Sequence, residues 1–322
     1  MEPETAGDPM SDQKWVRSSL RELSRKLEGA GYPVSPPTVG RLLEKLDYAL
    51  HVNAKKVEAS ASHADRNEQF EHIAAQRKAF QAAGWPIISV DTKKKELIGN
   101  FKNGGQAWSR QAEAVNVHDF PQQALGRAVP YGIYDLIHNR GTICVGSSGD
   151  TPQFAVDAIA RWWEDEGRTA FPGATQLLIL ADGGGSNGWQ PRLWKQQLQA
   201  QLCDRLGLTV TVCHYPTGCS KWNPIEHRLF SHISMNWAGK PLRTWDTTMA
   251  YIQGTKTATG LAVRAFRQGG EYKTGKKVSR AEMKALNLER HAVCPNWNYT
   301  IRPRSAPDSD NRPELSVREV NS

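Results

Sequence analysis

The sequence has few features of secreted or membrane proteins. Its 322 residues hold only five cysteines, with no Cys-x-x-Cys pair, and no apolar stretch approaches 18 residues. The odd cysteine count argues against a disulfide framework and favours reduced thiols. The missing apolar stretch excludes a membrane-spanning helix, and the acidic, Pro-rich start is unlike a signal peptide. We therefore expect a cytoplasmic protein.

Acidic residues are also in deficit. The chain has 33 Asp and Glu against 41 Lys and Arg, which gives a formal net charge of +8. The surplus is concentrated in residues 254–305, which hold eleven Lys and Arg but only three Asp and Glu. A local basic field of this kind indicates a phosphate-binding surface, with nucleic acid as the first candidate partner. The net charge alone is also compatible with ordinary solubility.

Two short amphipathic helices are predicted within residues 14–56. The first carries Trp15 and Leu23 on its apolar face, and the second begins at Pro36 after the capping residue Ser35. Two such helices with a tight break predict a helix-turn-helix DNA-binding domain, and a plain helical hairpin is the alternative. The side chains expected to face the DNA groove are Thr38, Arg41 and Lys45.

Residues 85–253 alternate between strand and helix patterns. A strand at 86–90 is expected to pair with residues 95–101 as a hairpin, and later strands alternate with amphipathic helices. This order predicts an α/β fold with a ribonuclease-H-like mixed sheet flanked by helices, and a doubly wound sheet is the alternative. The other segments are predicted to be a disordered linker remnant at 1–13, a helical connector at 57–84, a basic C-terminal extension at 254–305 and a disordered tail at 306–322.

Three carboxylates have positions that suit chemistry. Asp91 and Asp182 each directly follow a run of apolar strand residues, and α/β sheets place their sites at the carboxyl ends of strands. A simple strand-ending aspartate is the alternative for either residue alone. Glu226 lies in NPIEHRLF, where a capping box begun by Asn223 would explain it. It also shares an apolar helix face with Phe230, where a carboxylate is costly unless it is paired or metal-bound.

Phosphodiester cleavage would give these three carboxylates a common role. Two Mg²⁺ ions roughly 3.5–4 Å apart can activate the attacking oxygen and stabilise the leaving oxygen, and Mg²⁺ prefers carboxylate oxygens. Asp91, Asp182 and Glu226 would then bind the metals. The glycines of ADGGGSNG also fit a dinucleotide-binding pattern, but the acidic residue expected at the end of the next strand is missing.

Several longer motifs point to a known family. The chain resembles the Rhodopirellula-type family of bacterial insertion-sequence transposases, which are similar to mariner-like DDE transposases in sharing an Asn-Pro-x-Glu pattern. The resemblance covers about residues 14–304. It is carried by VDTKKKELIGNFKN, VNVHDFP, YGIYDL, LLILADGGGSNG, CHYPTGCSKWNPIEHRLFSHISMNW and WNYTIRPR.

The resemblance implies a metal-dependent polynucleotidyl transferase with its acidic triad at Asp91, Asp182 and Glu226. The expected cofactor is Mg²⁺, two ions per site, with Mn²⁺ as a substitute. The expected partners are the DNA ends of the element, target DNA and a second copy of the chain, in a bacterial cytoplasm at the nucleoid. Family members look longer at the amino end, so the expectation is a truncated copy, a misplaced start or a processed chain. The alternatives are a ribonuclease-H-like nuclease without strand transfer and a non-catalytic DNA-binding remnant or repressor.

Further side chains are candidates for DNA contact because they flank the three carboxylates in sequence. The lysines could hold phosphates, the polar residues could hydrogen-bond the substrate, and the tryptophan could stack on a splayed base. A solvated turn and an ordinary helix surface are the alternatives. The candidates are Lys93, Lys94, Lys95, Ser186, Asn187, Lys221, Trp222 and His227.

Overall fold

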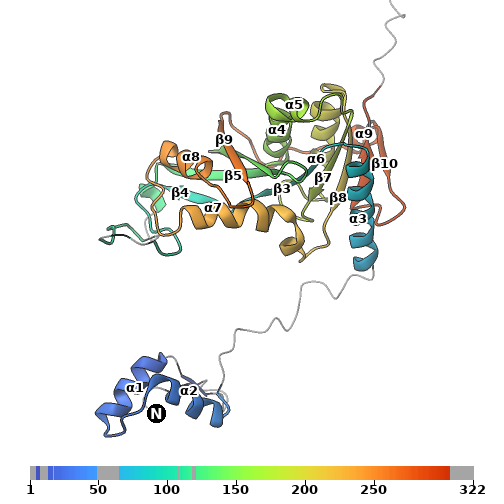
Figure 1. The fold of residues 1–322 in the computed structure, drawn as a ribbon. Coiled ribbons are helices and arrows are strands. Elements are labelled where there is room, and N and C mark those ends of the chain that lie inside the picture. Colours follow the sequence, from blue (N-terminus) through green and yellow to red (C-terminus); the bar gives the residue numbers. More distant parts are fainter. Residues whose placement is uncertain are drawn as a thin grey trace, which may run out of the picture. The chain divides into compact units, whose positions relative to one another are not determined.

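The computed structural model describes residues 5–7, 14–16, 18–48, 65–107, 109, 111–117 and 121–304. They belong to two compact units, one within residues 1–58 and the other within residues 59–322 (Figure 1). The predicted tail at 306–322 lies outside the described residues, as do most of residues 1–13 and residues 49–64. None of the helices in the described parts of the chain has the length and apolar content to cross a bilayer.

The first unit holds the two predicted helices. Helix α1 is Leu20–Gly29 and helix α2 is Pro36–Lys45; the short strands β1 (Thr5–Gly7) and β2 (Lys14–Val16) pair with each other. Two details differ from the prediction. Trp15 lies in β2 rather than on the helix face, because Ser19 caps α1 and its Oγ accepts a hydrogen bond from the Glu22 amide. In addition, β1 lies inside the segment predicted to be disordered.

A nine-stranded mixed sheet forms the centre of the second unit. Its order is β10-β11-β8-β7-β3-β5-β6-β9, with β4 paired to β5. Strand β3 runs antiparallel to β5 and parallel to β7, which runs parallel to β8. The predicted ribonuclease-H-like mixed sheet is therefore confirmed. The strands are β3 (Ile87–Thr92), β4 (Glu96–Ile98), β5 (Gly126–Asp135), β6 (Arg140–Gly146), β7 (Gln176–Ala181), β8 (Thr209–His214), β9 (Ala262–Gln268), β10 (Leu288–Arg290) and β11 (Asn298–Ile301).

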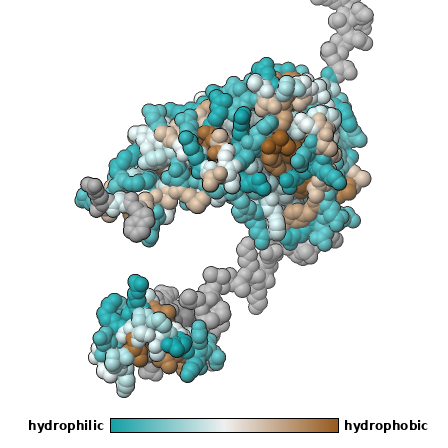
Figure 2. Space-filling model, viewed as in Figure 1, coloured by the Kyte–Doolittle hydropathy of each residue, from teal (hydrophilic) through white to brown (hydrophobic). Residues whose placement is uncertain are grey.

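Helices cover both faces of this sheet, which explains why its central strands are apolar on both sides. Helices α4 and α6 pack on one face, against Val90 and Ile179, while α3, α7 and α8 pack on the other, against side chains such as Leu178 and Tyr134 (Figure 1). The visible surface of the second unit is mostly hydrophilic (Figure 2).

The helices are α3 (Arg66–Ala82), α4 (Pro152–Trp162), α5 (Arg168–Ala170), α6 (Arg192–Gln197), α7 (Ser231–Asn236), α8 (Trp245–Gln253) and α9 (Arg280–Lys284). π-Helical segments continue α4 and α6 at Trp163–Gly167 and Leu198–Asp204 and precede α7 at Glu226–Phe230; short 3-10 helices are Pro121–Gln123 and Ser220–Trp222.

Two connections differ from the sequence prediction. The predicted hairpin between 86–90 and 95–101 is wrong: β4 pairs with Gly126–Ala128 of β5, because β5 and β7 already occupy the two edges of β3. The segment expected as a basic C-terminal extension is built into the sheet at both edges. Its strand β9 pairs with β6, while β11 pairs with β8, so residue 253 does not mark the end of a compact unit.

Candidate active site

Two of the predicted acidic residues lie side by side at the middle of the sheet. In the parallel pair β3 and β7, Val90 is in register with Ala181. The next residue of β3 is Asp91, and the residue that directly follows β7 is Asp182, so the pairing of the two strands brings both side chains to the same end of the sheet. Both line a cavity of about 600 Å³, which we call the aspartate cavity.

Burial and mutual repulsion shift the acidity of this pair. Burial, followed by the charge of Asp182 and smaller effects of Glu226 and Asp150, raises the pKa of Asp91 to about 8, although a hydrogen bond from the Thr92 amide opposes the shift. Burial and then the charge of Glu226 raise the pKa of Asp182 to about 6, against a hydrogen bond from Asn223. The ionised site therefore concentrates negative charge that a cation would relieve.

Asn223 connects the sheet to the helix that carries Glu226. Its Nδ2 donates to Asp182 Oδ1 at 2.9 Å and to the Val90 carbonyl at 3.3 Å, while its Oδ1 accepts from the Ser89 hydroxyl. Ser89 Oγ in turn accepts from the Ile225 amide at 3.1 Å. The side chain of Asn223 is thus fully engaged with the sheet, and the expected capping box of Asn223 with Glu226 does not form.

Glu226 opens the π-helical segment and is half-buried. Its carboxylate acts electrostatically on both aspartates, and it lines a neighbouring cavity of about 870 Å³. The segment that carries Glu226 lies close to the sheet because β5 has a glycine at the point of contact. Gly132 is the partner of Asp91 on β5, and a Cβ there would lie only 2.4 Å from Phe230 and 2.8 Å from Ile225.

A fourth carboxylate, which the sequence analysis missed, joins the group. Asp150 Oδ1 accepts a hydrogen bond from Thr92 Oγ1 at 3.0 Å, and its other oxygen is 3.5 Å from Lys95 Nζ. Asp150 also lines the aspartate cavity and contributes to the raised pKa of Asp91. Its position directly before the capping residue Thr151 and the proline that begins α4 offered only a weak signal, because acidic residues are common at helix starts.

The lysines that follow Asp91 have three different environments. Lys93 is buried, with its Nζ 3.5 Å from Glu96 and over the ring of Trp237 at 4.7 Å, so its charge is used inside the protein. Lys94 is exposed and lines both cavities. Lys95 is exposed but paired with Asp150. Among the three, Lys94 has the environment best suited to an external phosphate.

The other predicted contact residues are divided between surface and interior. Ser186 and Asn187 are both buried: the Ser186 hydroxyl lies 3.4 Å from that of Thr92, and the Asn187 carbonyl contacts the ring of His214 at 2.9 Å. Trp222 is 55% exposed and rests edge-on against Phe70. Lys221 and His227 are exposed; Lys221 Nζ lies 5.7 Å from the Trp222 ring, and His227 Nε2 contacts the Lys221 carbonyl. On α2, Arg41 and Lys45 are exposed and Thr38 is half-buried.

The carboxylates of the site have the chemistry of metal ligands. Carboxylate oxygens are the ligands that Mg²⁺ prefers. Asp91 and Asp182 supply them in the aspartate cavity, and Glu226 supplies them in the neighbouring cavity. Within the described residues, however, no three His, Cys, Asp or Glu side chains are already grouped as a metal site. The ligand chemistry fits a hard divalent cation, and binding has to include side-chain movement.

The sequence profile of a family described as the Rhodopirellula transposase DDE domain matches residues 1–303. Among curated proteins there is no match. Among solved structures, the Mos1 transposase paired-end complex with left transposon end is 14% identical, with 73% of this chain and 65% of that chain covered and a TM-score of 0.45. The Mos1 strand transfer complex is 13% identical, with 76% and 72% covered and a TM-score of 0.43.

Proposed function

The chain belongs to the Rhodopirellula transposase DDE domain family, and on that premise we propose that it is a DNA transposase. It cuts DNA at the ends of an insertion sequence and transfers the freed 3′-hydroxyl to target DNA. The observation that carries the proposal is the register of β3 and β7, which sets Asp91 beside Asp182 within the electrostatic reach of Glu226. The chain spans 65% of the length of the Mos1 chain in the paired-end complex.

Asp91, Asp182 and Glu226 hold the metal in this proposal. Two Mg²⁺ ions, or Mn²⁺ in their place, would supply an activated attacking oxygen and a stabilised leaving oxygen. Asn223 orients Asp182 through the 2.9 Å hydrogen bond, as partners behind metal ligands commonly do. Because the pKa of Asp91 is about 8, this carboxyl would have to release a proton at neutral pH in order to hold a metal.

The substrate contacts come from both units. Thr38, Arg41 and Lys45 lie at positions i, i+3 and i+7 of α2 and would face the groove of the element ends. Lys94 and Lys221 line the two cavities at the carboxylates and would contact backbone phosphates. Ser186, beside Thr92, would hydrogen-bond the substrate. Trp222 offers an exposed ring for a splayed base. Two ends must be joined in one event, so the working form would be a homodimer on DNA.

One assay separates this function from its rivals. Purified chain is mixed with a labelled duplex of the inverted repeats that flank its gene and a target plasmid, with Mg²⁺ or Mn²⁺ and then with EDTA. A transposase cuts and joins in a metal-dependent way, and Asp182→Asn lowers both steps by about 10³-fold or more, roughly 4 kcal/mol of barrier. Asp204→Asn is the matched control, because Asp204 is paired with Arg304 at the end of the second π-helical segment.

The other outcomes identify the rivals. Cleavage without joining indicates a nuclease without strand transfer, and binding without cleavage indicates a DNA-binding remnant or repressor. Cleavage by Asp182→Asn at the rate of the parent would contradict the carboxylate site itself.

A further inference from the structure

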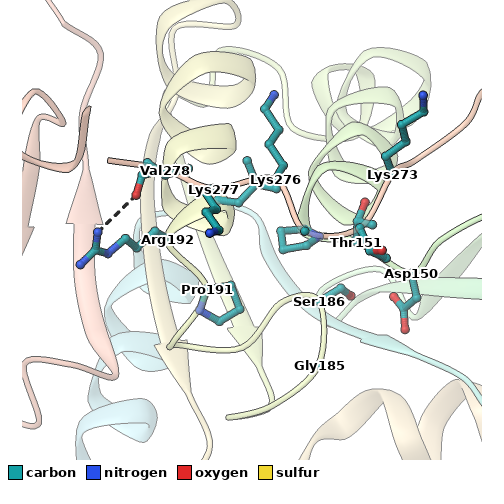
Figure 3. Close-up of a pocket in the computed structure, with 14 residues that line it drawn as sticks. Asp150, Thr151, Gly185, Ser186, Pro191, Arg192, Lys273, Lys276, Lys277 and Val278 are labelled. Atoms are coloured by element: carbon teal, nitrogen blue, oxygen red, sulfur yellow. Dashed lines mark hydrogen bonds between the residues drawn. The ribbon is translucent and has the colours of Figure 1, made fainter. Parts of the chain in front are cut away.

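A third cavity, of about 630 Å³, adjoins the aspartate cavity. The two share Asp150 and Gly185. Its walls are the loop that follows β7, the start of α4 and residues 273–278 of the segment after β9 (Figure 3). We call residues 269–278 the strap, and the space beneath it the strap cavity.

Hydrogen bonds fix the strap at both ends. Near its beginning, Ser148 Oγ donates to the Gly270 carbonyl at 3.3 Å and accepts from the Tyr272 amide at 3.2 Å. At its end, Arg192 Nη1 donates to the Val278 carbonyl at 3.2 Å (Figure 3). The beginning of the strap also packs closely on Gly149, where a Cβ would lie 2.4 Å from the Tyr272 carbonyl oxygen. The strap therefore holds a defined position over the cavity.

Basic residues outnumber acidic ones around the strap cavity. Its lining contains one acidic side chain, Asp150, against Arg192 and three lysines of the strap, Lys273, Lys276 and Lys277. The lysines are exposed. In Figure 3, Lys277 extends toward Pro191, whereas Lys273 and Lys276 extend from the opposite side of the strap. Lys277 is therefore the strap lysine on the side of the cavity, and Lys273 and Lys276 add positive charge on the outer side of the strap.

We propose that the strap cavity binds the backbone phosphates of a DNA strand, as a site separate from the one at Asp91 and Asp182. The proposal rests on the proposed function for its ligand class. A cavity of this volume has the size that holds small molecules, so it admits a nucleotide with its phosphate. Lys277 supplies the charge. Ser186, which lines this cavity and whose hydroxyl lies 3.4 Å from that of Thr92, supplies a hydrogen bond.

Binding of a single strand is measured first, without catalysis. The full chain and Lys277→Ala bind a labelled oligothymidylate in EDTA over a range of salt concentrations, followed by fluorescence anisotropy. Lys277→Ala weakens binding about 3–10-fold and lowers the slope of log Kd against log salt by about 1. Lys284→Ala, which removes the same charge from the exposed end of α9, keeps the parental slope, and Lys277→Arg restores it.

The source of the strand is measured next. If the strap cavity holds the transposon strand, Lys277→Ala slows cleavage of the element end. If it holds the target strand, cleavage is unchanged, and joining of a pre-cut end to a plasmid falls by a similar 3–10-fold. Either result supports the phosphate site.

Two results would overturn the site. One is a salt slope for Lys277→Ala equal to that of the parent, and the other is an equal loss of slope in Lys284→Ala, which would indicate diffuse charge only. The proposed function fails independently of both, because it fails only when the parent neither cuts nor joins DNA, whatever Lys277→Ala does to oligothymidylate binding.

Discussion

The paired aspartates and Glu226 reach the candidate site by different routes. Asp91 and Asp182 are set by the register of two parallel strands, which is maintained by backbone hydrogen bonds along both. Glu226 depends on a helix start that is tied to the sheet through side chains and through the space left at Gly132. The sheet-borne pair should therefore tolerate single substitutions nearby, whereas the position of Glu226 should be lost when one contact changes.

The largest expected effect comes from Asn223. Its side chain bonds to Asp182 and, through Ser89, is connected to the start of the helix that carries Glu226. Asn223→Ala removes the hydrogen bond to Asp182 and leaves the buried Ser89 hydroxyl without its acceptor. The Mg²⁺ concentration for half-maximal cleavage should rise about 10–100-fold, the usual range for residues behind metal ligands. Cleavage rates over a Mg²⁺ titration provide the measurement.

Asn298→Ala is the matched control for Asn223→Ala. Asn298 is equally buried but donates to Gln69 and the Val293 carbonyl. Both variants should lose roughly 1–3 kcal/mol of unfolding free energy. If Asn298→Ala shifted the Mg²⁺ requirement as far as Asn223→Ala, general destabilisation would explain the effect and Asn223 would have no positioning role.

A pair of glycines tests the helix side alone. A Cβ at Gly132 would lie 2.4 Å from Phe230, and one at Gly141 would lie 2.3 Å from Leu229, which belongs to the same π-helical segment. Both alanine variants should be destabilised by about 1–3 kcal/mol through overpacking. Only Gly132→Ala, beside Asp91, should also raise the Mg²⁺ requirement, by roughly 10-fold. Equal Mg²⁺ requirements in the two variants would contradict this account.

The smallest expected effect concerns pH and stability on the sheet side. The folded pKa of Asp91 is about 8 against an ordinary value of 3.8, so the protonated carboxyl stabilises the fold at low pH. This stability is lost as the pH rises from about 4 through 8. In metal-free buffer at pH 8, Asp91→Asn should melt several degrees above the parent, since 1 kcal/mol corresponds to about 2–4 °C in a domain of this size.

Thermal melts at pH 5 and pH 8, with and without Mg²⁺, check this prediction. The gap between Asp91→Asn and the parent should narrow at pH 5, and Mg²⁺ should stabilise the parent but not the variant. A gap that widens at pH 5 would have the wrong sign and would rule out a raised pKa of Asp91.

The sequence was informative wherever local pattern decides structure. The apolar runs before Asp91 and Asp182 identified both strands and the sheet end that they share, and Ser35 with Pro36 identified the start of α2. These features depend on neighbours in the chain, so a single sequence contains them.

Contacts between residues far apart in the chain could not be predicted from the sequence. Strand β4 looked like the hairpin partner of β3, but only the complete sheet reveals that β7 takes the second edge. Asn223 looked like a helix cap because asparagine is common at that position. Its hydrogen bonds reach Asp182, which is 41 residues away in the chain, and Ser89, which is 134 residues away. Asp150 escaped notice for the same reason, since its partner Thr92 is 58 residues away.

The central claim is that Asp91, Asp182 and Glu226 together hold the catalytic metal. Direct measurement of Mn²⁺ binding by electron paramagnetic resonance, with element-end DNA present, tests it without requiring turnover. The parent should bind two ions per chain, and Asp91→Asn, Asp182→Asn and Glu226→Gln should each lose at least one, while the control Asp204→Asn keeps both. Parental Mn²⁺ binding in all three carboxylate variants would contradict the claim.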